Sequence, residues 1–378
     1  MKKTNFIRRK FIQKIFAIIL LPVSVSQLVS KSEAKTFAEE IDGFINLKDF
    51  LTNDDWLDCN SNEPKNDHSY ALNNALKKGN KIYLPPVKGC YLFQEVKVPT
   101  GAILKGNVEL PYTVKSINDI KGSGSAISFF SKGKNIFKVN NHVTFSGLVF
   151  FGNRYIDGVV SDTGKKISNV RIDACGFYNF RVGIGSLTNY IKIDVRDCIS
   201  SSNKIGLANV VDSKITTSTF NSNSQFGIAL NKGANDNILS ELKVEWNGIN
   251  NLFIAFAVNN IVSTSIFDRA GKAGLYISNA ELVLNSIVIR RSGGIAKQEA
   301  DSTHLYIVNS NLIITGVLTK KGRNDDGKGK LSPNYSIYID DKNKSGSIIV
   351  SDSDLSGVII SPIYNKVEAS IKIRNSIL

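Results

Sequence analysis

The chain has few of the residues that build metal centres and cofactor sites. Its 378 residues include three histidines and four cysteines. The histidines, His68, His142 and His304, are too widely scattered to suggest ligands of one metal ion. No phosphate-binding glycine loop and no dinucleotide fingerprint is present. The sequence therefore predicts neither a metal site nor a cofactor.

Methionine, tryptophan and long apolar runs are scarce as well. One Met and two Trp stand against many Asn, Ser, Ile and Val residues, which is a composition typical of β-structure. The apolar stretch at residues 15–23 is too short to cross a membrane as a helix. Basic residues do not gather in an aromatic-plus-basic nucleic-acid module or in an amphipathic helix. We expect a folded β protein with no nucleic-acid partner and no membrane span once its leader is removed.

The first 34 residues have the pattern of an export signal. Basic residues precede the apolar stretch 15–23, and small residues follow at 32–34. Residues 8–14, RRKFIQK, resemble the twin-arginine export motif, and a general secretory signal is the alternative. Both predict an exported bacterial protein, periplasmic or extracellular. Residues 1–34 supply +6 of the formal charge of +14, and the remaining +8 favours an anionic partner.

A short run of alternating apolar residues restarts seven times at nearly equal intervals of 24, 24, 24, 23, 23 and 21 residues. A second apolar run trails most of them. Alternation with period two indicates strands, and neither a leucine-rich repeat frame nor helical periodicity fits. The sequence predicts an all-β parallel β-helix, a solenoid in which residues at equal coil positions form ladders. The first runs begin at Val143, Ile167, Ile191, Ile215, Ile238, Ile261 and Leu282.

Residues 67–79 read as a short helix that caps the open end of the solenoid. Asp67 or Ser69 is suited to the N-cap, and Gly79 to the stop signal. An exposed strand edge invites pairing with other chains, and a helix laid across it prevents this. We therefore divide the chain into the signal 1–34, a cap segment 35–106 and the β-helix 107–378.

The segment after this helix carries a family resemblance. Residues 81–93, KIYLPPVKGCYLF, and 98–106, VPTGAILKG, are similar to two strands of pectate-lyase-like β-helix proteins, "IYLPxGxYxF" and "GxxLxG". The resemblance implies a right-handed parallel β-helix that acts on or binds polysaccharide. An export signal followed by such a β-helix is also similar, by architecture, to the exported β-helix proteins of colanic-acid and related exopolysaccharide clusters.

The four cysteines fall into two pairs. Cys59 and Cys90 flank the segment before the solenoid and could form a disulfide. Closing a loop of about 30 residues would contribute about 3 kcal/mol in the chain-entropy model. Cys175 and Cys198 fall on adjacent coils, and we expect them to stay reduced as buried thiols.

The coil register predicts an inward column and an outward one. An Asn also precedes the second strand of several coils, where stacked amides could bond to each other. The inward column is predicted as Cys175, Cys198, Phe220, Val244, Phe267 and Ile289, the outward column as Gly176, Ile199, Asn221, Glu245, Asp268 and Arg290, and the amide row as Asn179, Asn203, Asn223 and Asn247.

The charged part of the outward column is the candidate site. Glu245 and Asp268 would lie one strand spacing apart, near the carboxyl separation of retaining glycosidases, and Arg290 continues the stack. Such carboxylates serve as acid, base or nucleophile. A surface ion-pair ladder is the alternative. The adjacent residues could bind substrate, because arginines neutralise uronates and an indole stacks on a sugar: Trp246, Arg269 and Arg291.

The sequence leaves the activity open. The calcium-binding and Arg-x-Pro-x-x-Arg motifs of pectate lyases and the acidic motifs of polygalacturonases are absent, and Asp325-Asp326 lies in a charged, glycine-rich stretch that reads as a solvated, calcium-binding or glycan-binding loop. We expect an exported protein that acts on or binds an acidic exopolysaccharide, in its biosynthesis or processing. The alternatives are a polysaccharide lyase or glycoside hydrolase, and a phage-tail or adhesin-like structural β-helix. The oligomeric state stays open.

Overall fold

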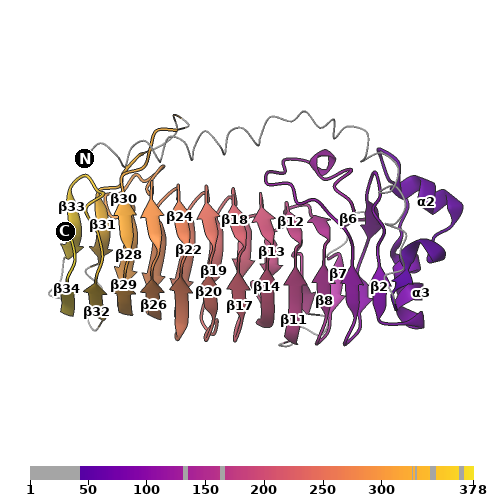
Figure 1. Cartoon of the computed structure of the whole chain (residues 1–378), viewed down its shortest axis with the longest axis horizontal. Helices are drawn as coiled ribbons and strands as arrows, with labels where there is room; N and C mark the ends of the chain where they lie inside the picture. The colour runs from indigo at the N-terminus through magenta and orange to yellow at the C-terminus, as the bar shows by residue number, and fades with distance from the viewer. Residues whose placement is uncertain are drawn as a thin grey trace, which may run out of the picture. The chain divides into compact units, whose positions relative to one another are not determined.

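The described chain winds through parallel strands that stack in three large sheets and one small sheet (Figure 1). The structure is a computed structural model that describes residues 43–130, 135–161, 167–325, 327, 330–340, 346–365 and 370–378. The chain from Phe44 onward forms one compact unit. The predicted export signal, residues 1–34, lies outside the described residues.

The first sheet has 13 strands, one from each successive coil, and its strands pair in parallel. The seven predicted apolar runs all begin in one of its strands or one residue before it, and most of them continue into the second sheet, which confirms the cadence. Its strands, in order, are β1 (Ile45–Asn46), β2 (Lys81–Tyr83), β5 (Ile103–Lys105), β8 (Thr144–Ser146), β11 (Ile167–Asp173), β14 (Ile191–Arg196), β17 (Lys214–Thr216), β20 (Ile238–Ser240), β23 (Asn260–Ser263), β26 (Glu281–Asn285), β29 (Asn311–Thr315), β32 (Ser347–Ser351) and β34 (Ser370–Arg374).

The second sheet has 10 strands and follows the first along each coil. Its strands also pair in parallel. They are β3 (Tyr91–Phe93), β6 (Ala126–Phe129), β9 (Val149–Phe151), β12 (Gly176–Tyr178), β15 (Ile199–Ser201), β18 (Thr219–Asn221), β21 (Lys243–Glu245), β24 (Ile266–Asp268), β27 (Val288–Arg290) and β30 (Leu318–Lys320).

The third sheet has eight strands and contains the predicted trailing runs. A three-stranded sheet takes its place in the first coils. The all-β parallel β-helix predicted from the sequence is thereby confirmed. The third sheet consists of β13 (Val182–Gly185), β16 (Ile205–Ala208), β19 (Phe226–Leu230), β22 (Asn250–Ala255), β25 (Leu275–Ser278), β28 (Thr303–Val308), β31 (Tyr335–Ile339) and β33 (Ser361–Asn365), and the small sheet of β4 (Val96–Val98), β7 (Phe137–Val139) and β10 (Val160–Ser161).

Sharp corners separate the second sheet from the third. In six consecutive coils one residue with a left-handed backbone makes this turn. Such a backbone costs a residue other than glycine about 1–2 kcal/mol, and Asn tolerates it best. These corner residues are Asn179, Ser202, Ser222, Trp246, Arg269 and Arg291, with φ values of 61°, 59°, 54°, 58°, 54° and 52°.

Inward side chains form one continuous core cluster along the stack. The inward column of the second sheet differs from the prediction in its first two members, because Phe177 and Ser200 occupy the places assigned to Cys175 and Cys198. Only 20 residues separate Ser200 from its neighbour Phe220, so equal coil lengths gave the wrong register. The observed column is Tyr91, Ile127, Phe150, Phe177, Ser200, Phe220, Val244, Phe267, Ile289 and Thr319.

Stacked amides line the inside of the corner between the second and third sheets. The backbone N–H of Asn203 donates to Asn223 Oδ1 at 3.0 Å, and Asn223 Nδ2 donates to Asn247 Oδ1 at 3.0 Å. The predicted amide row is therefore confirmed for these three residues. Asn179 is not part of it, because it occupies the corner position itself. The side chains of all three residues are buried, where water cannot reach them, so the bonds along the row supply the hydrogen-bond partners that the buried amides need.

Helices cover the end of the stack that precedes β2 (Figure 1). The predicted capping helix is α3 (Ser69–Lys78). Its N-cap is His68, whose side chain makes no capping bond, rather than Asp67 or Ser69; Asp67 accepts the backbone N–H of Ser69 at 2.9 Å. The buried apolar residues of α3 join the core cluster. Coils begin upstream of residue 107, because β2 and β5 already belong to the first sheet. The other helical elements are η2 (Leu47–Phe50), α2 (Asn53–Cys59) and η3 (Ile117–Asp119).

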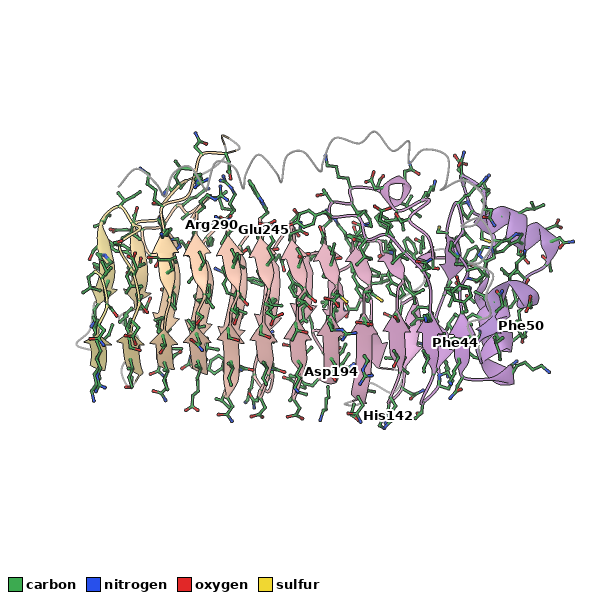
Figure 2. All side chains as sticks on the ribbon, in the orientation of Figure 1. Phe44, Phe50, His142, Asp194, Glu245 and Arg290 are labelled. Atoms are coloured by element: carbon green, nitrogen blue, oxygen red, sulfur yellow. The ribbon has the colours of Figure 1, made fainter. Side chains whose placement is uncertain are left out.

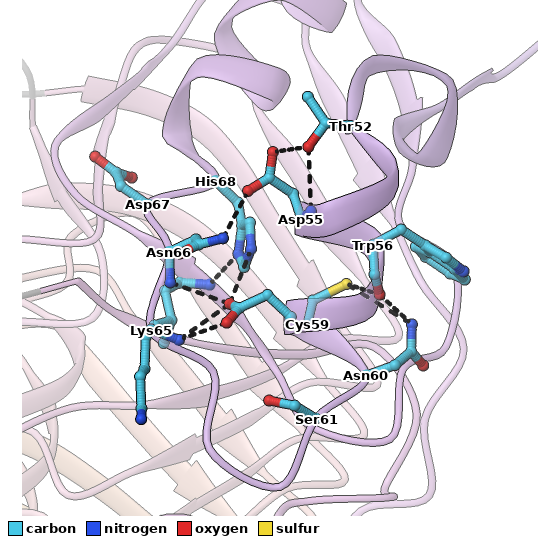
Figure 3. A network of polar contacts seen from close by, with 12 residues as sticks. Thr52, Asp55, Trp56, Cys59, Asn60, Ser61, Lys65, Asn66, Asp67 and His68 are labelled. Atoms are coloured by element: carbon cyan, nitrogen blue, oxygen red, sulfur yellow. Dashed lines mark hydrogen bonds and ion pairs between the residues drawn. The ribbon is translucent and has the colours of Figure 1, made fainter.

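His68 lies at the centre of a polar network that holds the cap together (Figure 3). Its ring is fully buried, and Nδ1 accepts the backbone N–H of Leu92 at 3.0 Å. Its Nε2 lies 3.4 Å from a carboxylate oxygen of Asp58. That carboxylate also accepts the backbone N–H groups of Lys65 and Asn66 at 3.0 Å. Burial lowers the pKa of His68, and nearby aspartates partly oppose the shift.

The disulfide between Cys59 and Cys90 is not formed. All four cysteines are free and buried. Cys59 belongs to the core cluster and its thiol donates to the Trp56 carbonyl at 3.3 Å, whereas Cys90 belongs to a second apolar cluster outside the coil. Burial raises the pKa of both thiols to about 12.

No helix in the part of the chain that the structure describes is long and apolar enough to span a bilayer.

Candidate functional site

Glu245, Asp268 and Arg290 are direct neighbours on β21, β24 and β27. The predicted register of these three residues is confirmed, and Figure 2 shows Glu245 and Arg290 along the same side of the stack. Gly176 and Ile199 belong to a different column. The column changes from apolar to neutral polar to charged along the solenoid: Leu92, Ser128, Phe151, Tyr178, Ser201, Asn221, Glu245, Asp268, Arg290 and Lys320.

A long loop between β5 and β6, residues 106–125, covers the apolar part of this column. We call it the covering loop. Val114 and Ile120 of the loop pack on a small apolar cluster outside the second sheet, which includes Phe151 and Tyr178. Ser202 donates to the carbonyl of Val114 at 2.6 Å. These contacts hold the loop over the sheet as far as the charged residues.

Tyr112 of the covering loop meets Glu245. Its hydroxyl donates to Glu245 Oε1, and Lys243 Nζ donates to the same hydroxyl at 2.8 Å. Lys243 Nζ also lies 3.2 Å from Glu245. Burial and the bond to Glu245 raise the pKa of Tyr112, and the bond to Tyr112 raises the pKa of Lys243. The phenol therefore keeps its proton and donates a hydrogen bond to Glu245.

Asp268 is tied to two arginines. Arg291 grips both carboxylate oxygens, with Nε donating to Oδ1 at 2.7 Å and Nη2 donating to Oδ2. Arg290 Nε donates to Oδ2 at 2.9 Å. Asp268 is only 1% exposed, and its bonds raise the pKa of Arg291 further. This geometry favours the ion-pair ladder over a nucleophile or base at Asp268, because neither oxygen is free to reach a substrate.

Arg269 and Arg291 also share a second carboxylate. Asp325, in the loop after β30, accepts from Arg291 Nη1 at 2.5 Å and from Arg269 Nη2 at 3.2 Å. Arg291 lowers the pKa of Asp325. The Arg269 guanidinium lies over the Trp246 ring, 4.6 Å from its centroid. Asp326 lies outside the described residues.

Two adjoining pockets flank Trp246, and together they form what we call the groove. One holds about 460 Å³ and is lined by the covering loop, Asn221 and Glu245. The other holds about 340 Å³ and is lined by Arg269, Arg291 and Lys330. Both share Trp246, which is 39% exposed. Within the described residues no three His, Cys, Asp or Glu side chains come together as a metal site.

The corner residues beside the groove are unusual for their position. Three coils place Asn179, Ser202 and Ser222 at this left-handed corner, whereas the next three coils place Trp246, Arg269 and Arg291 there. Bulky side chains in this backbone conformation cost about 1–3 kcal/mol each. The backbone therefore does not explain the choice of residues, whereas the contacts of their side chains with Asp268, Asp325 and one another offset its cost.

Tyr112, Lys243 and Asp325 are site residues that the sequence did not identify as such. Tyr112 is 133 positions upstream of Glu245, and only the path of the covering loop joins them. Lys243 could have been found, because it lies two positions before Glu245 and points to the same face of the strand. Asp325 was noted as part of a charged loop, but nothing in its spacing linked it to Arg269 and Arg291.

Solved structures share this architecture. The A-module of mannuronan C-5 epimerase AlgE4 from Azotobacter vinelandii aligns over 86% of this chain and 98% of its own length, with a TM-score of 0.58 and 14% identity. The enzymatically active domain of tailspike protein 2 from bacteriophage CBA120 aligns over 82% of this chain and 49% of its own, with a TM-score of 0.60 and 12% identity. The chain has the pectin-lyase-like right-handed parallel β-helix fold.

A third β-helix similar to this chain is DFA-IIIase from Arthrobacter chlorophenolicus A6 without its lid. It aligns over 88% of this chain and 93% of its own length, with a TM-score of 0.56 and 12% identity. No protein-family model matches the chain. At 12–14% identity the likeness of these structures concerns the fold, and the roles of Glu245 and its neighbours rest on the geometry of this β-helix alone.

Proposed function

We propose that this β-helix binds an anionic polysaccharide in the groove. The observation that carries the proposal is the row of Trp246, Arg269 and Arg291 at left-handed corners of successive coils: Trp246 lines both pockets, and the two arginines line one of them. An indole face stacks on the apolar face of a sugar ring, and guanidinium groups pair with carboxylates. Open grooves on a solenoid also suit an extended chain.

Two further findings support a carbohydrate ligand. The fold neighbours include a mannuronan C-5 epimerase and a DFA-IIIase solved in complex with DFA-III. The chain carries a net positive charge, which favours an acidic rather than a neutral glycan. The twin-arginine-like residues 8–14 lead us to place this binding outside the cytoplasm, on an exopolysaccharide that is being made or processed.

Cleavage of the bound chain is the second candidate function. It is favoured by the hydrogen-bonded set of Tyr112, Glu245 and Lys243 at the wall of the groove. A protonated phenol beside a carboxylate can supply general acid and general base in a lyase or a glycoside hydrolase. A retaining pair of Glu245 with Asp268 is disfavoured, because Asp268 is occupied by its two arginines.

The binding test compares Trp246→Ala with the wild-type protein on a mannuronate polymer. Calorimetric titration should show roughly five- to thirtyfold weaker binding, because stacking and cation–π contacts of a Trp are worth about 1–2 kcal/mol. Phe256→Ala is a matched control, since Phe256 is an exposed aromatic at another left-handed corner, with φ of 56°. Equal affinities of the Trp246 variant and the wild type would exclude the groove as the binding site.

A further inference from the structure

The loop after β30 places its own carboxylate on the two arginines of the groove. Asp325 accepts hydrogen bonds from Arg269 and Arg291, at 3.2 and 2.5 Å. The side chains of these arginines are 4% and 6% exposed, whereas that of Asp325 is 59% exposed. An exposed carboxylate thus bonds to two buried guanidinium groups.

Each of the two guanidinium groups has a second contact besides Asp325. Arg291 is held on its other side by the carboxylate of Asp268, through two further nitrogens. The guanidinium of Arg269 rests on the ring of Trp246. A pair of oriented guanidinium groups is a preformed receptor for a carboxylate, because it offers parallel N–H donors and positive charge.

Releasing Asp325 would take one negative charge away from the guanidinium groups of Arg269 and Arg291. The carboxylate of Asp268 would still bond to Arg290 and Arg291. Buried guanidinium groups require an anion close by. The corner therefore favours either the Asp325 carboxylate or an equivalent group from a ligand.

We propose that Arg269 and Arg291 form a carboxylate subsite for a uronate residue, and that Asp325 is an internal competitor which the uronate displaces. The proposal rests on the proposed polysaccharide-binding function and names its substrate class. The Lys330 and Trp246 side chains line the same pocket, so the sugar ring that carries the carboxylate can lie on the indole. Binding exchanges one carboxylate for another, and no covalent bond changes.

The test is the variant Asp325→Asn, which keeps the size of the side chain and removes its charge. Its affinity for a mannuronate oligosaccharide should rise roughly fivefold, because an exposed ion pair of ordinary strength occupies the subsite most of the time in the wild type. The same oligosaccharide with its carboxylates reduced to alcohols should bind both proteins equally. Asp325→Ala should behave like Asp325→Asn.

Asp173→Asn is the matched control. Asp173 also pairs with an arginine, Arg196, at 2.9 Å on an exposed surface, but on the outer face of the first sheet. Its affinity for the oligosaccharide should equal that of the wild type.

The outcomes separate this proposal from the one on which it rests. Wild-type binding with no gain in the Asp325 variants overturns the internal competitor and leaves groove binding in place. A gain that is as large for the reduced oligosaccharide overturns the carboxylate subsite. Absence of binding in the wild type and in the Asp325 variants overturns both proposals.

Discussion

Replacing Asp268 by Asn tests whether this residue is structural or functional. Asp268 accepts three hydrogen bonds from Arg290 and Arg291, and its carboxylate is buried. A charge-assisted bond contributes about 1.5–3 kcal/mol, so three bonds set an upper limit of roughly 4.5–9 kcal/mol. Part of this is retained, since Asn still accepts one bond and Arg290 is 39% exposed and can be hydrated. Breaking a buried pair typically costs about 3–5 kcal/mol, and we expect a loss in this range.

Urea denaturation measures this loss, and the two tryptophans report on different parts of the β-helix. Trp246 lies at the groove, and Trp56 lies in α2, at the helix-covered N-terminal part of the chain's coils. Because coils contact only their neighbours, the Trp246 signal should move to lower urea more than the Trp56 signal. The control Asp173→Asn breaks a pair whose arginine is 65% exposed and hydrated, and should leave both urea midpoints nearly unchanged.

A double variant sharpens the measurement. In Asp268→Asn with Arg291→Gln the buried cation is removed as well, so the double variant should be destabilised by less than the sum of the two single changes. A stable Asp268→Asn protein that has lost glycan cleavage would refute the ion-pair interpretation and assign Asp268 to the chemistry.

Two further changes have defined outcomes. His304 is fully buried, and burial lowers its pKa to about 3, whereas an unfolded histidine titrates near 6.5. The stability that neutral His304 provides is complete above pH 6.5, and it falls by about 1.4 kcal/mol per pH unit as the pH falls towards 3. The variant His304→Gln should therefore show a smaller fall in urea midpoint between pH 6.5 and 4 than the wild type, whereas the control His142→Asn, at an exposed histidine, should not. An unchanged slope in His304→Gln would contradict this. If the protein cleaves its glycan, Tyr112→Phe should keep the affinity and reduce the rate of product formation about 10²-fold or more, followed by size analysis of the oligosaccharides; an unchanged rate would leave Tyr112 a purely structural contact of the covering loop.

Much of the fold could be predicted because each coil of a solenoid repeats a similar apolar pattern along the sequence. Apolar alternation at Ile191 and Ile238 marks strands whose partners lie one coil away, so local pattern and tertiary pairing coincide. The same logic placed Glu245, Asp268 and Arg290 side by side, since the coils there keep lengths of 23 and 22 residues. Register failed where a coil shortens to 20 residues, between Ser200 and Phe220.

The covering of the site could not be predicted from the period. Glu245 and Asp268 point outward from the coil, as expected, yet both are buried by segments that the repeat does not describe. Tyr112 and Asp325 come from insertions between strands, and where an insertion folds depends on contacts such as those of Val114 with the outer face of the second sheet. The free Cys59 and Cys90 show the same limit, because their distance along the chain says nothing of the separate clusters into which they pack.

The covering loop limits how the length of this protein can change in evolution. It leaves the stack before β6, and its tyrosine touches Glu245 on β21, five strands further along the second sheet. At roughly 4.8 Å per strand the loop spans about 24 Å. Duplication or deletion of one coil inside that span would carry Glu245 away from Tyr112 by a full strand spacing. Solenoids usually tolerate such changes in repeat number. Here the fixed span of the covering loop restricts them to coils beyond the groove.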